Sequence, residues 1–296
     1  MVWPSSACTE SLNWYTALMC RYALPLLLTA NAFAQWVNLP APGVPRLPNG
    51  KPNLTAKAPR LNGKPDLSGV WDVAGTPLSR FQSLFGPSFK DDNNPIGMEL
   101  DALSIYGIDV FADFEFGKEP MRPAAAQVFG RRFPDGPEAL PSTHCLPMPL
   151  LPAMLLSEPI KFVQASGVTM MLIEFNNDYR QIYTDGRKLE VTPSPATYGY
   201  SVGHWDGDTF VVESNGFKNE GWLDVLGHPN SEALRMTERY RRRDFGHLDA
   251  EITLDDSAMY TRPITFKVTF DLLADADLYE YTCLENEKDK AHMGLK

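Results

Sequence analysis

Histidines are the residues of this chain whose side chains are best suited to acid–base chemistry near neutral pH. There are five of them, His144, His204, His228, His247 and His292. Their spacing gives neither a His-Glu-x-x-His helix motif nor a close His-x-His pair, and the chain has no Gly-x-Ser-x-Gly, Walker or dinucleotide-binding motif. We therefore expect no metal and no organic cofactor, and we retain His204 and His228 as candidate general acids or bases.

His204 lies in the segment Tyr200–Trp205, whose residues alternate like those of a β-strand. Alternation places His204 on the same face as Tyr200 and Val202, and that face is partly apolar. Burial on such a face would tune the pKa of the imidazole for a general base. The competing interpretation is a histidine that caps a turn at the end of a hairpin.

His228 lies in a loop of turn-forming residues, between Gly227 and Pro229, and Trp222 and Asp224 come shortly before it. Loops at the mouth of a β-barrel often carry function. Trp222, Asp224 and His228 could therefore form a polar and aromatic rim for an aromatic ligand. A loop held together only by local hydrogen bonds is the alternative.

Further ligand-binding candidates lie on the predicted strands. Glu238 and Arg239 are neighbours, so their side chains face opposite sides of one strand, and in a closed barrel one of them points inward and needs a partner. An inward Arg239 could bind a carboxylate through two hydrogen bonds, or the pair could tie one barrel end together. Tyr179, Gln181 and Tyr183 share a strand face and could line a cavity, with plain aromatic packing as the alternative. Tyr200 is a further candidate for ligand binding.

About ten short strands position these side chains. The alternating segments are Leu67–Val73, Lys161–Gln164, Val168–Phe175, Tyr179–Thr184, Tyr200–Trp205, Thr209–Ser214, Arg235–Arg243, His247–Leu254, Ile264–Leu272 and Leu278–Cys283. Most are joined by short turns, which force neighbouring strands to be antiparallel. A long antiparallel meander removes its exposed edges by closing. The sequence therefore predicts an all-β antiparallel barrel, with a β-sandwich as the alternative.

The segments outside these strands are less regular. Residues 35–66 are rich in Pro, Gly and Asn and are expected to form an extended linker. The barrel domain would then cover residues 67–296, with an irregular and partly helical insertion at 76–142. Within the insertion, Met121–Arg132 is the best helix candidate, with Pro123 in its first turn.

The N-terminal segment has the pattern of a secretory signal peptide. Arg21 precedes the apolar run 22–30, and Ala32-Phe33-Ala34 follows as a cleavage motif. We expect residues 1–34 to be removed and the exported chain to begin at Gln35, in the periplasm or outside the cell. An ordinary N-terminal helix is the alternative.

The predicted export determines the oxidation state that we expect for the remaining cysteines. Cys145 and Cys283 remain after removal of the signal peptide, and an oxidising compartment favours one disulfide between them. Two buried free thiols are the alternative.

The net charge and the apolar segments of the chain limit the kinds of molecule that it can bind. The formal net charge is −10, so phosphate backbones and anionic lipids are repelled. No segment after the predicted signal peptide approaches the length of a transmembrane helix. We therefore expect a small-molecule partner, with no nucleic acid and no stable membrane anchor.

Several motifs carry a resemblance to known proteins. Gly69-Val70-Trp71 resembles the Gly-x-Trp signature that opens lipocalin barrels. The segments Gly63–Trp71, Ile182–Arg187, Gly203–Glu213, Gly227–Leu234, Thr237–Arg242 and Glu285–Asp289 resemble an uncharacterised family of secreted, β-rich proteins from acidobacteria and sphingomonads. The resemblance implies export and a β-rich fold but no particular activity. This chain has Asn230 where family members often have a second histidine.

Three functions are compatible with these observations. The first is a cofactor-independent lyase, isomerase or hydrolase that acts on a small hydrophobic or aromatic molecule, with His204 or His228 as acid or base. The second is a non-catalytic binding protein for scavenging or delivery, and the third is a structural envelope protein. A cavity that contains a histidine and a carboxylate favours the first, a dry apolar cavity the second, and a fully packed interior the third.

Overall fold

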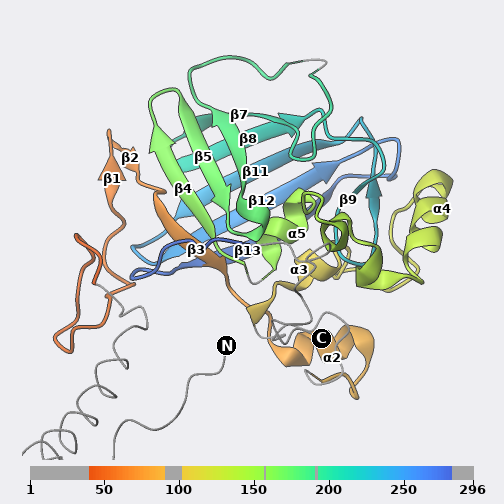
Figure 1. The fold of residues 1–296 in the computed structure, drawn as a ribbon, viewed down its shortest axis with the longest axis horizontal. Coiled ribbons are helices and arrows are strands. Elements are labelled where there is room, and N and C mark those ends of the chain that lie inside the picture. Colours follow the sequence, from red (N-terminus) through yellow and green to blue (C-terminus); the bar gives the residue numbers. More distant parts are fainter. Residues whose placement is uncertain (1–39, 91–101, 157, 191–192, 282–296) are drawn as a thin grey trace, which may run out of the picture. The chain divides into compact units, whose positions relative to one another are not determined.

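The computed structural model describes residues 40–90, 102–156, 158–190 and 193–281 (Figure 1). The predicted signal peptide, residues 1–34, lies outside the described residues. In the described part of the chain, none of the helices is both long and apolar enough to cross a membrane.

Nine β-strands form a closed barrel, which confirms the predicted fold class. They are β3 (Gly69–Val73), β4 (Ile160–Ala165), β5 (Val168–Ile173), β6 (Asp178–Tyr183), β7 (Tyr200–Asp206), β8 (Thr209–Asn215), β11 (Arg235–Arg242), β12 (His247–Asp255) and β13 (Ile264–Leu272). Each strand pairs with the next one along this series, and β13 pairs with β3 to close the barrel. Two additional two-stranded pairs are β1 (Arg60–Leu61) with β2 (Lys64–Pro65), and β9 (Gly221–Trp222) with β10 (Pro229–Asn230).

The predicted hairpins form because glycines occupy their turns. Gly207, between β7 and β8, has a φ of 59°, and Gly167, between β4 and β5, has a φ of 76°. Glycine adopts this left-handed region without the steric cost that a Cβ brings. The turn at Gly207 sets the register of its hairpin, in which Asp206 lies opposite Thr209.

One pair of neighbouring strands departs from the antiparallel pattern. β6 and β7 run parallel and share only two register pairs, Ile182 with Ser201 and Tyr183 with Val202. Their connection, residues 184–199, is far longer than a tight turn, and parallel neighbours require such a crossover. We refer to this weakly paired junction as the β6–β7 seam.

The prediction of a tenth strand at Leu278–Cys283 is wrong for residues 278–281, and the rest lies outside the described residues. β13 already pairs with β12 on one side and with β3 on the other. No free edge of the closed barrel is therefore left at β13 for a further strand. Instead, the Tyr279 N–H donates to the Glu174 carboxylate at 2.8 Å.

The inward faces of the strands fill the barrel. Large buried side chains inside it include Trp71, Phe162, Phe210, Tyr240 and Phe270. At Gly203 an added Cβ would lie 2.6 Å from the ring of Phe210, so this close packing is possible because residue 203 has no side chain. The barrel therefore encloses a packed core rather than a central ligand cavity.

Short helices close one end of the barrel, and we call this end the helical end (Figure 1). The helices of the described chain are α2 (Leu78–Phe85), α3 (Ile105–Ile108), α4 (Pro123–Arg132) and α5 (Leu150–Leu155), with 3₁₀ turns η4 (Gly136–Ala139), η5 (Pro141–His144) and η6 (Phe175–Asn177). All six residues of α5 are buried, and Tyr106 of α3 stacks on Phe266 of β13 at 4.6 Å between ring centroids. The helix predicted at Met121–Arg132 is observed as α4, with Pro123 at its start.

Residues 43–66 are packed against the barrel, although the sequence predicts an extended linker there. Residues from Gly43 onward belong to the same compact unit as the barrel. The Phe245 and Gly246 N–H groups donate to backbone carbonyls of this segment, each at 2.7 Å. Arg46 forms a two-point ion pair with Asp275. The segment has no core of its own, but these contacts fix it to the barrel end opposite α5.

Candidate functional site

The loop between β9 and β10 carries a buried acid–base pair. The His228 Nδ1 lies 2.6 Å from the Asp224 Oδ2, and both side chains are essentially inaccessible to solvent. Asp109 of the helical insertion lies close by, with its Oδ1 3.9 Å from the same Nδ1. The structure therefore brings together Asp224 and His228, as the sequence predicts, and adds Asp109, which the sequence analysis did not identify.

Asp224 holds this loop against the insertion. Its carboxylate accepts hydrogen bonds from the Val110 N–H at 2.9 Å, the Gly227 N–H at 3.0 Å and the His228 N–H at 3.1 Å. A carboxylate with these donors is an acceptor, so the Nδ1 of His228 donates to it. In the neutral imidazole the proton then resides on Nδ1, and Nε2 keeps its lone pair. This Nε2 is buried and has no hydrogen-bond partner among the residues that the structure describes.

Burial and charge alter the proton affinities of this cluster. Burial raises the pKa of Asp109 to about 7, and the charge of Asp224 adds to this effect. Burial lowers the pKa of His228, but the charge and the hydrogen bond of Asp224 outweigh it, so the pKa of His228 is raised overall. The cluster can therefore hold and release protons near neutral pH.

The same three side chains could in principle hold a cation, because two carboxylates and an imidazole place ligand atoms within 4.8 Å of one another. Both oxygens of Asp224, however, already accept hydrogen bonds, from the Val110, Gly227 and His228 N–H groups and the His228 ring. A cation would displace these donors. The contacts therefore favour an acid–base pair over a metal centre.

Aromatic rings enclose His228. Phe129 of α4 stacks on the imidazole at 4.2 Å between centroids, with the two planes 10° apart, and Phe111 lies 4.6 Å away. The imidazole itself is fully buried. This enclosure separates His228 from solvent, and by burying the imidazole it opposes the rise in pKa that Asp224 causes.

An apolar cavity of about 250 Å³ lies at the helical end, and we call it the end cavity. Its walls come from α5, from the ends of β11 and β12, and from the segment before and within β9. The apolar lining residues include Leu150, Leu151, Phe217, Trp222, Leu234, Met236 and Leu254. Trp222 lines this cavity, whereas Asp224 and His228, which the sequence predicts to form one rim with Trp222, are not among its lining residues.

Two contacts shape the wall around Trp222. Arg132 lies over the Trp222 ring, 4.6 Å from its centroid, and donates to the Gly221 carbonyl at 2.9 Å. An added Cβ on Gly221 would lie 2.2 Å from the Asn230 Oδ1, so the Asn230 side chain keeps this position beside β9 because residue 221 is glycine. Gly221 and Asn230 both line the end cavity.

The barrel interior holds a second polar cluster. Glu238 points inward and accepts two hydrogen bonds from Arg180 and one from the Tyr240 hydroxyl. Arg180 also donates to Ser201 and Ser214. Glu238 is predicted from the sequence, but Arg180 is not. Arg180 shares its strand face with the apolar Ile182, and this alternation indicates that the Arg180 side chain points inward.

The remaining predicted residues lie on the outer surface. Arg239 donates to Asp206 at 2.8 Å on the outside of the barrel, and His204 is exposed on β7. Tyr179, Tyr183 and Tyr200 lie together along the β6–β7 seam, where they line a groove of about 390 Å³. The structure therefore separates His204 and Arg239 from the buried pair but gathers the three tyrosines. Cys283 lies outside the described residues.

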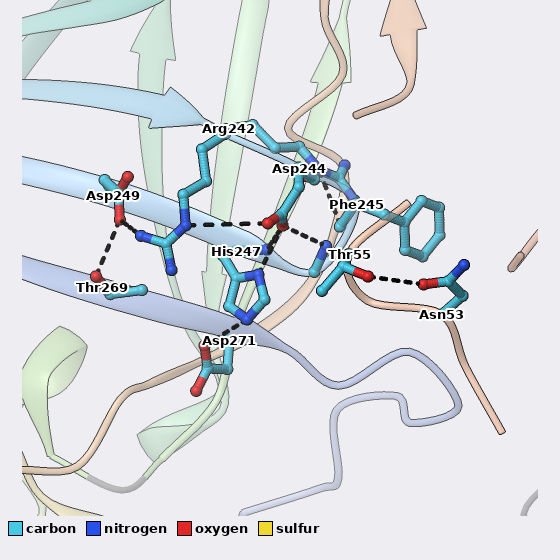
Figure 2. Close-up of polar contacts among 11 residues, drawn as sticks. Asn53, Thr55, Arg242, Asp244, Phe245, His247, Asp249, Thr269 and Asp271 are labelled. Carbon is cyan, nitrogen blue, oxygen red and sulfur yellow. Dashed lines mark hydrogen bonds and ion pairs between the residues drawn. The ribbon is translucent and has the colours of Figure 1, made fainter. Parts of the chain in front are cut away.

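A third titratable cluster lies at the barrel end opposite α5 (Figure 2). The His247 Nδ1 lies 2.6 Å from the Asp244 carboxylate, and its Nε2 is 3.9 Å from Asp271. Nearby, Thr269 donates to Asp249 at 3.0 Å. These side chains are partly exposed to solvent, and Asp249 and Thr269 also line an open groove of about 490 Å³. They therefore have the character of a hydrated surface network.

Comparison with known proteins adds no identification. No family model matches the chain, and no curated protein and no solved structure matches it. The fold and the site geometry therefore define an all-β barrel with one apolar cavity at its helical end and one buried acid–base pair beside that cavity.

Proposed function

We propose that this protein binds a small apolar or aromatic molecule in the end cavity and does not transform it chemically. The observation that carries this proposal is the cavity itself, a space of about 250 Å³ with Trp222, Phe217 and Met236 in its wall. Apolar cavities of roughly 150 Å³ already bind a benzene-sized ligand in other proteins. A compound of one or two rings, or a short alkyl chain, matches the size and lining of the end cavity.

The packed barrel interior supports this location. Arg180 and Glu238 fill its centre, together with the rings of Phe162 and Tyr240. A ligand in the middle of the barrel would have to displace this network. The helical end, where α5 and the segment before β9 meet the barrel, therefore provides the space.

The residues around the cavity favour binding over catalysis. Within the described part of the chain, its lining contains no histidine, and its ionisable members are Lys218 and Glu220. The apolar part of the wall lowers the free energy of an apolar guest by removing its surface from water, by about 25 cal/mol per Å².

One observation favours a second candidate, acid–base catalysis at His228. Asp224 orients the imidazole so that Nε2 keeps its lone pair, which is the arrangement of a general base. Diethyl pyrocarbonate, which acylates accessible imidazole nitrogens, distinguishes the candidates, with the exposed His204 as an internal control. The binding proposal expects His204 to react and His228 to stay unmodified; faster modification of His228 would favour the catalytic candidate.

The binding proposal is tested by isothermal titration calorimetry with phenol, indole and 1-octanol. We expect at least one of them to bind with one-to-one stoichiometry. Leu234→Trp should fill the cavity and abolish binding, whereas the same substitution at exposed Leu61 should not. Equal binding by both variants would locate the ligand elsewhere, and no binding by the wild type would reject the proposal.

We also propose that the protein is exported and carries a disulfide between Cys145 and Cys283. Two neighbouring asparagines of η6 support this pairing. Asn176 donates to the Leu146 carbonyl at 2.9 Å, and Asn177 donates to the Tyr281 carbonyl at 2.7 Å. The backbone next to Cys145 and the backbone two residues before Cys283 are therefore held by the same turn.

A further inference from the structure

The β6–β7 seam opens into a groove whose walls carry four tyrosines. The outward faces of the two strands and the segment before β7 contribute Tyr179, Tyr183, Tyr198 and Tyr200, and the groove has a volume of about 390 Å³. Tyr179 is 57% exposed, although the ring is large and mostly apolar. The groove thus presents aromatic rings to solvent.

Polar groups accompany these rings. The Tyr183 hydroxyl donates to the Gln181 side chain at 3.1 Å, and the Tyr198 hydroxyl donates to Asp178 at 2.8 Å. Tyr183 and Tyr200 lie 5.5 Å apart between centroids. Hydroxyl, amide and carboxylate groups therefore lie beside the aromatic faces, and this combination suits a ligand that has both C–H faces and hydroxyl groups.

The charges of the groove favour a neutral ligand. Arg180, at its floor, is fully engaged by Glu238 inside the barrel, and Arg187, which stacks on Tyr183, is paired with Asp185. Neither guanidinium is left to bind a phosphate or a carboxylate. Because the chain as a whole is acidic, with a formal net charge of −10, anionic ligands are repelled further.

The groove and the end cavity share part of their walls. Pro147 and Thr197 line both hollows. The apolar space at the helical end and the tyrosine surface on the outside of the barrel therefore meet at this pair of residues. A ligand that passes them can place an apolar part in the cavity and a polar part on the tyrosines.

We infer that the ligand is a neutral glycoside-like amphiphile, whose sugar ring lies on the tyrosine groove while its alkyl or aryl part occupies the end cavity. This inference rests on the proposed binding function and specifies its ligand class. A pyranose stacks its C–H face on an exposed ring such as Tyr179, and its hydroxyl groups hydrogen-bond with Gln181 and Asp178. The tyrosine ring supplies apolar contact, and the polar side chains set the orientation of the sugar.

The test compares three probes that present the same octyl chain, all below their critical micelle concentrations. They are 1-octanol, octyl β-D-glucoside and octyl tetraethylene glycol, whose head is neutral and polar but has no ring. By calorimetry we expect the glucoside to bind at least fivefold more tightly than either of the other two. Tyr179→Ala should remove this advantage and leave octanol binding unchanged, and Tyr279→Ala, at an equally exposed tyrosine outside the groove, should change neither.

The outcomes separate the two proposals. If octanol binds but the glucoside gains nothing over the ring-free amphiphile, the groove is not a sugar site and the cavity proposal stands. If the glucoside keeps its advantage in Tyr179→Ala, the inference is also overturned. If none of the three probes binds the wild type, the cavity proposal fails and the glycoside inference fails with it.

Discussion

Arg180 and Glu238 meet inside the barrel through two hydrogen bonds of 3.0 and 2.6 Å, and their side chains are 1% and 0% exposed. Tyr240, Ser201 and Ser214 provide the other polar contacts of the pair. Each charge is stable at this depth only because the other is present. The pair therefore fills the barrel interior, which is why the proposed ligand site lies at the periphery.

Removal of one partner should be strongly destabilising. Glu238→Ala leaves the guanidinium of Arg180 buried without its counter-charge, and we expect a loss of about 3–5 kcal/mol in the free energy of unfolding. Urea denaturation followed by tryptophan fluorescence measures this loss. The double variant Arg180→Met/Glu238→Leu should be more stable than Glu238→Ala, because it removes both charges; a double variant that loses the sum of the single losses would contradict this account.

The buried acids should make stability fall as pH rises. The folded state raises the pKa of Asp109 to about 7, above the unfolded value near 4, so between these values the folded chain binds more protons than the unfolded chain. The raised pKa of His228 acts in the same direction, since its stabilisation is lost as pH rises through the folded pKa. Stability should therefore fall between pH 5 and pH 8.

Asp109→Asn should reduce this fall by roughly 1–3 kcal/mol, because asparagine cannot ionise. Denaturation at several pH values gives the slope. Asp185→Asn is the control: Arg187 lowers the pKa of this exposed carboxyl, so it stays ionised and should not affect the range from 5 to 8. Parallel curves for wild type and Asp109→Asn would show that Asp109 is not the buried acid described here.

The close approach of β9 and β10 can be tested at one glycine. Gly221→Ala would place a methyl group 2.2 Å from the Asn230 Oδ1, and we expect a loss of about 1–3 kcal/mol together with weaker binding in the end cavity. Gly130→Ala, in an exposed turn of α4 with open space around it, should instead stabilise by about 0.5–1 kcal/mol. Thermal denaturation compares the two, and equal effects would count against the proposed packing.

The disulfide and the export signal can be examined in one sample of protein recovered from the periplasm. Intact mass under non-reducing alkylation should show no alkylated Cys145 or Cys283, and the chain should begin at or near Gln35. Closure of a 138-residue loop (283 − 145) would contribute roughly 4–5 kcal/mol in the chain-entropy model, so reduction should lower the unfolding midpoint. Two alkylated thiols would reject the bond, and an N-terminus at Met1 would reject the cleavage.

Much of the barrel could be predicted because its signals are local. Glycine in the turn at Gly207 and strict alternation on the flanking strands specify a hairpin without any knowledge of distant residues. The tenth strand was wrongly predicted because alternation in Leu278–Tyr281 cannot report that the edge of β13 is already occupied. Closure of a barrel is a property of the whole chain.

The site was only partly predictable, for a similar reason. Asp224 and His228 are four residues apart, so their pairing is visible in one loop. Asp109 joins them from 115 residues before Asp224 (224 − 109), through an insertion with no regular pattern. His204 was a plausible base by its strand face, yet that face is the outer one, and alternation alone does not say which face of a strand is enclosed.

The most direct test of the central claim is a crystal structure of the protein soaked with 4-bromophenol, whose bromine is located by anomalous scattering. We predict one strong bromine peak in the end cavity, between Trp222 and Met236, and its loss in Leu234→Trp. An empty cavity at saturating 4-bromophenol, or a bromine peak only on the outer surface, would contradict the claim that this barrel binds small molecules at its helical end.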